Sequence, residues 1–157
     1  MINKEGWKKI TIDDCFETIR NGASIKQNDN HGGIPITRIE TISNSIFNRD
    51  RLGYANISES SLYSKYILND GDILMSHINS LKYLGRAVIY KKINDEVLIH
   101  GMNLLNLISK KEIVKPQYIT YYFSSETFKS NISRIAKKSV NQASFFQGYW
   151  LHPLHKQ

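Results

Sequence analysis

The sequence predicts an α+β fold, in which a curled, mixed or mostly antiparallel β-sheet is flanked by peripheral helices. Short apolar segments of strand length recur between turn residues, which favours several strands over a helical bundle. A long amphipathic segment beginning at Pro116 predicts one long helix toward the C-terminal end. No internal repeat, low-complexity tract or Pro- or Gly-rich linker divides the 157 residues, so we expect one domain with one core.

The first element is predicted as a short helix from Thr11 to Gly22. Thr11 can cap its start, two aspartates follow in the first turn, and Gly22 can close its end. Residues 23–33 are polar and predict a loop. The run from Ile34 to Ile39 then alternates like a strand, and Pro35 places its first residues at a sheet edge.

The middle of the chain predicts a second helix and a group of strands. Ser58 to Leu68 has helical spacing behind a serine cap and stops at the turn Asn69-Asp70-Gly71. A polar loop with one lysine covers residues 79–84. Pro116 fits the first turn of the longest helix, which we expect to run to Ala136. The strands predicted between these helices are Asp72–Ser76, Gly85–Tyr90, Val97–His100 and Asn103–Ile108.

The composition favours a polyanionic partner. The 21 Lys and Arg residues exceed the 14 Asp and Glu residues and give a net charge of +7, with a pI near 9.4. The single cysteine, Cys15, excludes an internal disulfide and a multi-cysteine zinc site, and we expect it to be a small buried side chain. Neither a signal-peptide pattern nor an apolar run of roughly 20 residues is present, so we expect a cytoplasmic protein.

The segment from Lys137 to Ser144 points most directly to a ligand class. Two lysines precede a row of short amides and hydroxyls, directly after the long amphipathic segment. Lysines can neutralise phosphates, while Asn, Gln and Ser side chains can discriminate at base edges. DNA is therefore the first partner to test, and a solvated surface loop is the alternative interpretation.

The usual sequence marks of catalysis are missing. The chain has no Gly-rich phosphate-binding loop and no His-Glu-x-x-His motif. His152-x-x-His155 could ligate a metal only on a helix, which Pro153 opposes, and Asp70-Gly71-Asp72 fits a tight turn better than a calcium loop. We therefore expect no catalytic residue, no metal and no cofactor.

His77 and His100 keep an enzymatic alternative open, because each lies near a predicted strand end and could act as a general base. No nucleophile or carboxylate is spaced so as to identify a partner for either one. A structural or DNA-contacting histidine is the better interpretation of both. The alternative is a small metal-dependent nuclease or DNA-modifying enzyme with dispersed carboxylates.

The order of landmarks resembles the target recognition domain of type I restriction-modification specificity subunits over about residues 6 to 146. The residues that carry the resemblance are Trp7 before Ile10, Gly22, Gly33-Ile34-Pro35-Ile36, Gly71-Asp72-Ile73-Leu74, Gly85, Asn103, Pro116-x-Tyr118 and Ser139-Val140-Asn141-Gln142-Ala143-Ser144.

The resemblance implies a non-catalytic reader of double-stranded DNA that recognises one half of a split target. It implies a methyltransferase subunit and a restriction subunit of the same system as partners. The chain departs from the family in having one such domain, residues 1–146, followed by an atypical tail, residues 147–157, where a spacer helix is expected. With a spacer helix, two copies could form a homodimer; without one, a truncated decoy subunit is a further alternative.

The expected DNA contacts lie on polar loops of the matching domain. Lysines and arginines would position phosphates, while Gln27, Asn79, Asn141 and Gln142 are the better candidates for base edges. The full set is Lys26, Gln27, Arg38, His77, Asn79, Lys82, Arg86, Lys137, Lys138, Ser139, Asn141 and Gln142.

Overall fold

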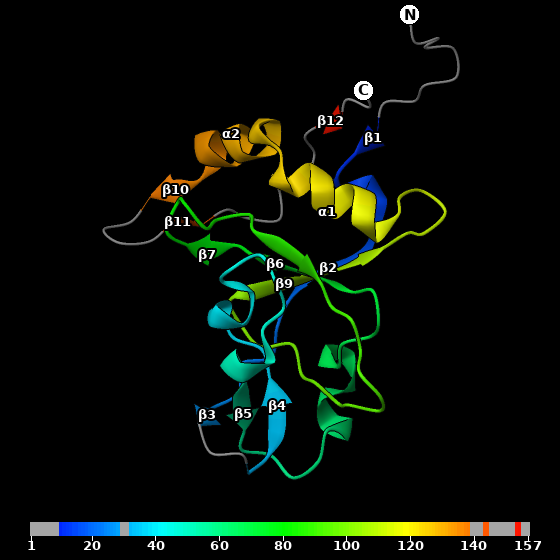
Figure 1. Ribbon diagram of the computed structural model, residues 1–157, viewed down its shortest axis with the longest axis vertical. Coiled ribbons are helices and arrows are strands. Elements are labelled where there is room, and N and C mark those ends of the chain that lie inside the picture. The colour runs from blue at the N-terminus through cyan, green and yellow to red at the C-terminus, as the bar shows by residue number, and fades with distance from the viewer. Residues whose placement is uncertain (1–9, 29–31, 139–142, 145–152, 155–157) are drawn as a thin grey trace, which may run out of the picture.

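A four-stranded antiparallel sheet forms the centre of the protein (Figure 1). The computed structural model describes residues 10–28, 32–138, 143–144 and 153–154. The strand order is β2-β9-β6-β8, with the bounds β2 Phe16–Asn21, β9 Leu104–Ser109, β6 Ile73–Ser76 and β8 Ala87–Ile89. Two helices, α1 Pro116–Ser124 and α2 Glu126–Ile135, run across one side of this sheet.

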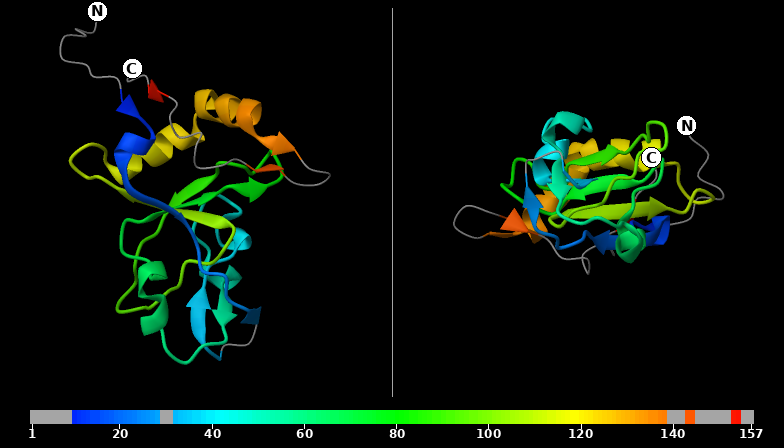
Figure 2. Two further views of the ribbon diagram at one scale, coloured as in Figure 1. Left: turned by 180° about the vertical axis from the view of Figure 1, so that it is seen from behind. Right: turned by 90° about the horizontal axis from the view of Figure 1, so that it is seen from below.

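Smaller sheets and 3-10 helices surround the central sheet. The sheet β3-β5-β4 lies at the end of the long axis farthest from the helices (Figures 1 and 2), and β10-β11-β7 lies beside the central sheet. These strands are β3 Gln27–Asn28, β4 Ile34–Ile36, β5 Gly53–Ala55, β7 Ile78–Asn79, β10 Lys137–Lys138 and β11 Ala143–Ser144, and β1 Ile10–Thr11 pairs with β12 Pro153–Leu154. The 3-10 helices are η1 Asp13–Cys15, η2 Ile39–Ile42, η3 Arg49–Arg51 and η4 Ser61–Tyr66. The α+β class with antiparallel sheets and peripheral helices is confirmed.

The central sheet buries both of its faces, because alternate residues of a strand point to opposite sides. Met75 and Leu107 point to the helix side, where they pack with Phe123, Phe128 and other residues of α1 and α2. On the opposite side a second cluster gathers Leu74, Val88 and Leu104 from the sheet with Ile42 from η2 and with Leu68, Tyr90 and Leu98 from the loops. Each large side chain fully buried this way contributes about 1.5–3 kcal/mol of transfer free energy.

The predicted helix from Thr11 to Gly22 is wrong. The capping signal operates locally, since Thr11 Oγ1 accepts from the Asp14 N–H at 3.3 Å and the Thr11 N–H donates to Asp14 Oδ2 at 2.7 Å, but the turn lasts only through η1. From Phe16 the chain is β2, because pairing with β9 and burial of Phe16 outweigh local helix propensity. Cys15 is fully buried, as expected, although in a 3-10 turn.

The single long helix predicted from Pro116 to Ala136 is two helices. Ser125 breaks it with extended backbone angles (φ −70°, ψ 151°), and its hydroxyl accepts a hydrogen bond from the Phe128 N–H at 3.2 Å. The serine therefore acts as the N-cap of α2. The break lets Phe123 and Phe128 meet in one core, with ring centroids 4.8 Å apart.

Three further predicted strands are present, whereas one predicted helix is of another type and one predicted strand is shorter. Strands over Asp72–Ser76, Gly85–Tyr90 and Asn103–Ile108 are confirmed as β6, β8 and β9 with small shifts of their ends. The helix predicted over Ser58–Leu68 is the 3-10 helix η4, and the strand over Ile34–Ile39 stops at Ile36.

The strand predicted over Val97–His100 is also wrong. Ile99 forms isolated bridges to Ile36 and Ile67 instead. Its own N–H and carbonyl oxygen bond to Pro35 and Thr37, while the neighbouring Leu98 and His100 bond to the segment around Ile67. None of the helices in the described part of the chain has the length and apolar character needed to cross a bilayer.

Candidate nucleic-acid interface

Gln27 on β3 and Arg38 at the start of η2, two of the predicted DNA contacts, form a hydrogen-bonded pair. Arg38 Nε donates to Gln27 Oε1 at 2.8 Å, and Arg38 Nη2 donates to the main-chain oxygen of Asn28 at 3.1 Å. Both side chains belong to half-buried residues. The planar guanidinium is therefore oriented by the protein itself rather than by a ligand.

Gly53 on β5 leaves the room that this pair occupies. A Cβ at position 53 would lie 2.3 Å from Arg38 Nε and 2.5 Å from Gln27 Oε1, well inside contact distance. The backbone of Arg38 is fixed as well, because its N–H donates to Thr41 Oγ1 at 2.9 Å. The geometry of the pair thus depends on β3, on β5 and on the residues that begin η2.

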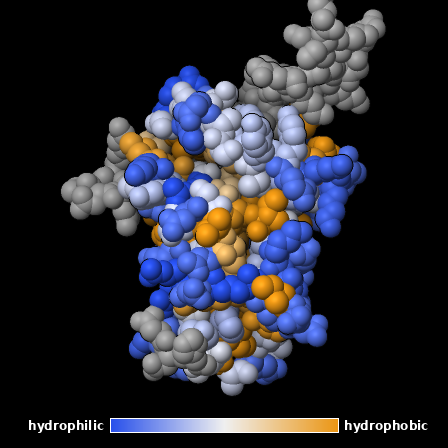
Figure 3. Space-filling model, in the orientation of Figure 1, coloured by the Kyte–Doolittle hydropathy of each residue, from blue (hydrophilic) through white to orange (hydrophobic). Residues whose placement is uncertain are grey.

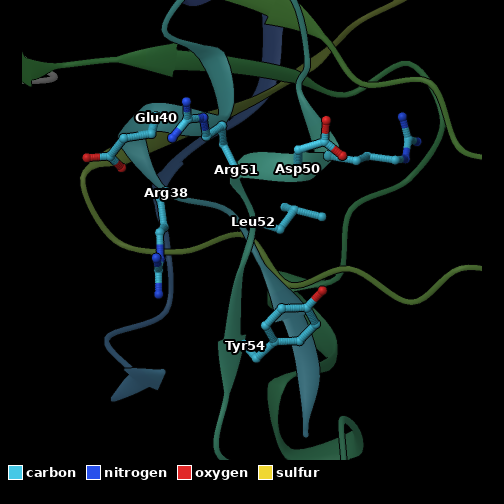
Figure 4. A pocket seen from close by; sticks show the side chains of 7 residues that line it. Arg38, Glu40, Asp50, Arg51, Leu52 and Tyr54 are labelled. Atoms are coloured by element: carbon cyan, nitrogen blue, oxygen red, sulfur yellow. The ribbon is translucent and has the colours of Figure 1, made fainter. Parts of the chain in front are cut away.

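An open hollow of about 380 Å³ lies beside this pair (Figure 4). We refer to it as the arginine hollow; it is lined by Arg38, Glu40, Arg49, Asp50, Arg51, Leu52 and Tyr54. In Figure 4 Arg38 and Arg51 extend in opposite directions, and Tyr54 lies on β5 below Leu52. The guanidinium groups, carboxylates and phenol that line it can donate to or accept from base edges, and the guanidinium groups can also bind phosphates.

Arg49 has a different role from the other two arginines. Its guanidinium donates to Glu96 Oε1 at 2.5 Å and Oε2 at 3.2 Å, and to the main-chain oxygen of Lys91 at 2.7 Å. The Tyr90 hydroxyl donates to the same carboxylate at 2.8 Å. The hydrogen bonds from Arg49 are the main reason that the pKa of Glu96 falls to about 2. Arg49 therefore ties the 91–96 loop to η3 and supports the wall of the hollow.

A second group of predicted contacts gathers on the loop between β7 and β8. Lys82 Nζ lies 5.4 Å and Arg86 Cζ lies 4.6 Å from the ring centroid of Tyr83, so both cations lie against one aromatic ring. Leu84, between them in sequence, is buried in the core under the helices. The Gly85 N–H donates to the Ser76 main-chain oxygen at 2.8 Å, which closes the loop on itself.

These two cations border a larger hollow of about 570 Å³ between the loop and the helices. We refer to it as the helix-side hollow; Lys82, Leu84 and Arg86 line one wall and Phe123, Lys129 and Ile132 line the other. Ser45, from the segment that follows η2, also borders it. Figure 3 shows that the face turned to the viewer is a hydrophilic surface interrupted by apolar patches.

A third group is formed by the small sheet β10-β11-β7. Asn79 pairs with Ala143, and Ala143 pairs with Lys138, so this sheet places the β7 segment in the same sheet as the two lysines of β10. The Asn79 side chain takes part in local structure: its Oδ1 accepts from the Ser80 N–H at 2.8 Å. His77 is half-buried, and burial lowers its pKa. Ser139, Asn141 and Gln142 lie outside the described residues.

The predicted contacts that lie within the described residues therefore form three groups. Lys26 is exposed next to Gln27 and belongs with Arg38 at the β3 end. The segment from 38 to 52 connects two of the groups, because it lines most of the arginine hollow and contributes Ser45 to the helix-side hollow. Both hollows consequently open on the same stretch of chain.

His100 does not have the environment of a catalytic base. It is fully buried, its Nε2 lies 2.8 Å from the Leu104 main-chain oxygen, and burial is the main reason that its pKa falls to about 4. Among the described residues, no cluster of three or more His, Cys, Asp or Glu side chains is arranged to hold a metal ion. His152 and His155 lie outside the described residues.

Asp70-Gly71-Asp72 forms the tight turn that the sequence predicts. Gly71 has a φ of +90°, Asp70 is exposed, and Asp72 is buried. Asp72 Oδ2 accepts from the Asn69 N–H at 3.0 Å and from Asn106 Nδ2 at 3.2 Å. The two carboxylates therefore have separate structural surroundings.

Four residues that border these surfaces were missed in the sequence. Arg51 and Tyr54 lie in the arginine hollow, and Tyr83 and Lys129 lie at the helix-side hollow or on its loop. The signal for Tyr83 is an aromatic residue between two cations in the run Lys82-Tyr83-Leu84-Gly85-Arg86. No comparable signal exists for Lys129, which is brought close only by the packing of α2.

The fold and these surfaces define a basic α+β binding domain with open, cation-bearing hollows. Residues 4–147 match the family described as the type I restriction modification DNA specificity domain, and the chain belongs to this family. The resemblance stated for residues 6 to 146 is thereby confirmed, and the nuclease alternative is not favoured.

Two curated relatives are named as specificity subunits of type I restriction enzymes. The chain is 43% identical over 148 residues to the specificity subunit ascribed to the type I restriction enzyme MjaX of Methanocaldococcus jannaschii, covering 94% of this chain and 35% of the relative. It is 28% identical over 137 residues to the EcoKI specificity subunit of Escherichia coli strain K12, covering 87% of this chain and 29% of the relative. The chain thus spans about a third of the length of these relatives.

Solved structures share the fold. A chain from a study of complex assembly and conformational transition of the type I R-M system superposes with a TM-score of 0.64 at 14% identity, covering 98% of this chain and 35% of that one. The HsdS subunit of Thermoanaerobacter tengcongensis gives a TM-score of 0.60 at 13% identity, covering 98% and 34%. At these identities the likeness supports the architecture described above.

Proposed function

We propose that this chain is a target recognition domain that reads one half of a bipartite duplex DNA target for a type I restriction-modification system. The observation that carries the proposal is the Arg38–Gln27 pair, which lies over Gly53 and whose arginine lines the arginine hollow. A fixed guanidinium suits bidentate recognition of the O6 and N7 acceptors of guanine in the major groove, so we assign Arg38 to base reading in place of the phosphate contact expected from the sequence. Family membership supports DNA as the polyanion that the net charge of +7 favours.

The other predicted residues divide between positioning and reading. Lys26, Lys82, Arg86, Lys137 and Lys138 neutralise phosphates along the duplex and set its register. Asn79 reads base edges once its side-chain oxygen gives up the hydrogen bond from the Ser80 N–H and accepts one from a base instead. Asn141 and Gln142 are proposed as further base-edge contacts and His77 and Ser139 as supporting contacts, on the sequence pattern alone.

The proposed partners follow from the family. A methyltransferase subunit and a restriction subunit act on the DNA that the domain selects, in the cytoplasm. A half-target alone gives weak binding, because a split site is held by two linked recognition domains and one domain forgoes the second, intramolecular binding event. Two copies joined through a spacer helix, as a homodimer, would read an inverted repeat.

Selection of bound duplexes from a random-sequence library tests the proposal. We expect one short motif to be enriched. Arg38→Lys keeps the charge but loses the planar fork, so it should relax the preference at one base position while total binding changes little. The proposal fails if the wild-type chain binds no duplex, or if it binds duplexes without enriching any motif.

A further inference from the structure

Lys82 and Arg86 place two cations on one wall of the helix-side hollow. In the part of the chain that the structure describes, no ion pair is recorded for Lys82 or Arg86. Lys82 Nζ and Arg86 Cζ lie 5.4 Å and 4.6 Å from the Tyr83 ring centroid, so both positive charges border the same aromatic ring. Gathering like charges without a counterion costs electrostatic free energy, and a bound anion removes that cost.

The opposite wall supplies a third cation from a different element. Lys129 on α2 lines the same hollow, and its Nζ lies 2.9 Å from Glu126 Oε1 one turn earlier. Both members of that pair are exposed, so the pair contributes little and is readily exchanged for another anion. Thr120 on α1 also borders the hollow, and its hydroxyl is buried without a hydrogen-bond partner.

The loop is fixed in this position by packing. Leu84 is buried with Phe128 and Ile132, and Gly85 adopts a φ of +76°, with a Cβ there lying 2.9 Å from Phe128 Cε1. The close approach of the loop to α2 therefore requires glycine at position 85. The loop that carries Lys82 and Arg86 is therefore held against α2 by its two middle residues, Leu84 and Gly85.

We infer that the helix-side hollow is a phosphate site for the DNA backbone, in which α2 contributes Lys129 as a contact in addition to Lys82 and Arg86. This inference rests on the proposed function and extends it from the loops to the helix pair. A DNA strand is favoured over an acidic protein surface, because Ser45 joins this hollow to the segment that forms the arginine hollow. One strand can then contact both hollows along the 38–52 segment.

The test measures the affinity of the full chain for a fluorescently labelled random-sequence duplex as a function of salt. Each phosphate neutralised contributes a slope of about −0.9 in log affinity against log salt. Lys82→Gln, Arg86→Gln and Lys129→Gln should each make the slope shallower by about 0.9. Arg86→Lys keeps the charge and should keep the slope.

Lys111→Gln is the matched control, because it removes one positive charge from an exposed lysine that lines a different hollow with Asp70 and Glu112. Its slope should equal that of the wild type, and all variants should unfold at the wild-type denaturant midpoint.

If the wild type binds with salt dependence and the three variants match Lys111→Gln, the inference is overturned while the proposed function stands. It is also overturned if the variants keep DNA binding but lose binding to the purified methyltransferase subunit. If the wild type binds no duplex at any salt concentration, the proposed function fails and this inference fails with it.

Discussion

A hydrogen bond of 2.8 Å from Arg38 Nε to Gln27 Oε1 joins two residues that lie 11 positions apart in the sequence. It fixes the side chain that we propose as the principal base reader. Because the bond crosses from the start of η2 to β3, the direction of the guanidinium depends on the fold of the whole β3-β5-β4 end. Specificity here should respond to changes that never touch DNA directly.

Gly53→Ala should alter the base preference while leaving the fold intact. The added Cβ would displace the ends of two flexible side chains, Arg38 and Gln27, so the protein can adjust but the pair cannot keep its geometry. Library selection should give a flatter preference at one position. Gly32→Ala is the control, because its Cβ would meet no atom within 4 Å. An unchanged selection profile for Gly53→Ala would show that the pair does not read bases.

Lys26 and Gln27 are neighbours with different expected roles. Lys26→Ala should weaken binding to all sequences alike, because a phosphate contact carries no sequence information. Gln27→Ala should reduce discrimination at one base pair by about 1–3 kcal/mol, since Arg38 loses its orienting partner. Affinities for matched and single-mismatch duplexes separate the two effects. Equal, uniform losses for both variants would contradict this division.

Gly85→Ala should destabilise the protein. The residue has a positive φ, and a methyl group would lie 2.9 Å from the Phe128 ring, so backbone strain and overlap add to about 1–3 kcal/mol. Chemical denaturation measures this, and Gly32→Ala should stay within about 0.5 kcal/mol of wild type. If Gly85→Ala had the same free energy of unfolding as the wild type, the packing of this loop against the helices would contribute nothing to stability.

Stability should fall with decreasing pH because of His100. Its folded-state pKa is depressed to about 4 from 6.5, chiefly by burial, so folding favours the neutral ring. The contribution is fully present above pH 6.5 and is lost as the pH falls toward about 4. His77 adds in the same direction, because burial lowers its pKa too. Denaturation midpoints across this window should decline less for His100→Gln than for the wild type; parallel declines would refute the assignment.

The central strands could be predicted from the sequence, because β6 and β9 are apolar on both faces and are bounded by turn residues such as Asp70-Gly71. The strand after Thr11 could not be predicted from the sequence. Its capping residues do form the hydrogen bonds of a helix start, and only the pairing with β9 makes the segment a strand. Ser125 is a common N-cap residue, but the apolar periodicity on both sides of it predicts one continuous helix, so the break was not predicted.

Within the candidate site, residue types could be predicted but not their grouping. Gln27 and Arg38 were singled out as separate contacts, and only the room above Gly53 brings them together. Arg49 is engaged by Glu96, 47 residues away, a separation that no local pattern reveals. Lys129 reaches the helix-side hollow because the chain turns at Ser125.

The most direct measurement is a structure of the chain bound to the duplex that library selection enriches. Our account predicts that the Arg38 guanidinium lies within hydrogen-bond distance of a base edge in the major groove while Gln27 still accepts from its Nε. A complex in which Arg38 contacts only phosphate or solvent, and another segment reads every base, would contradict it.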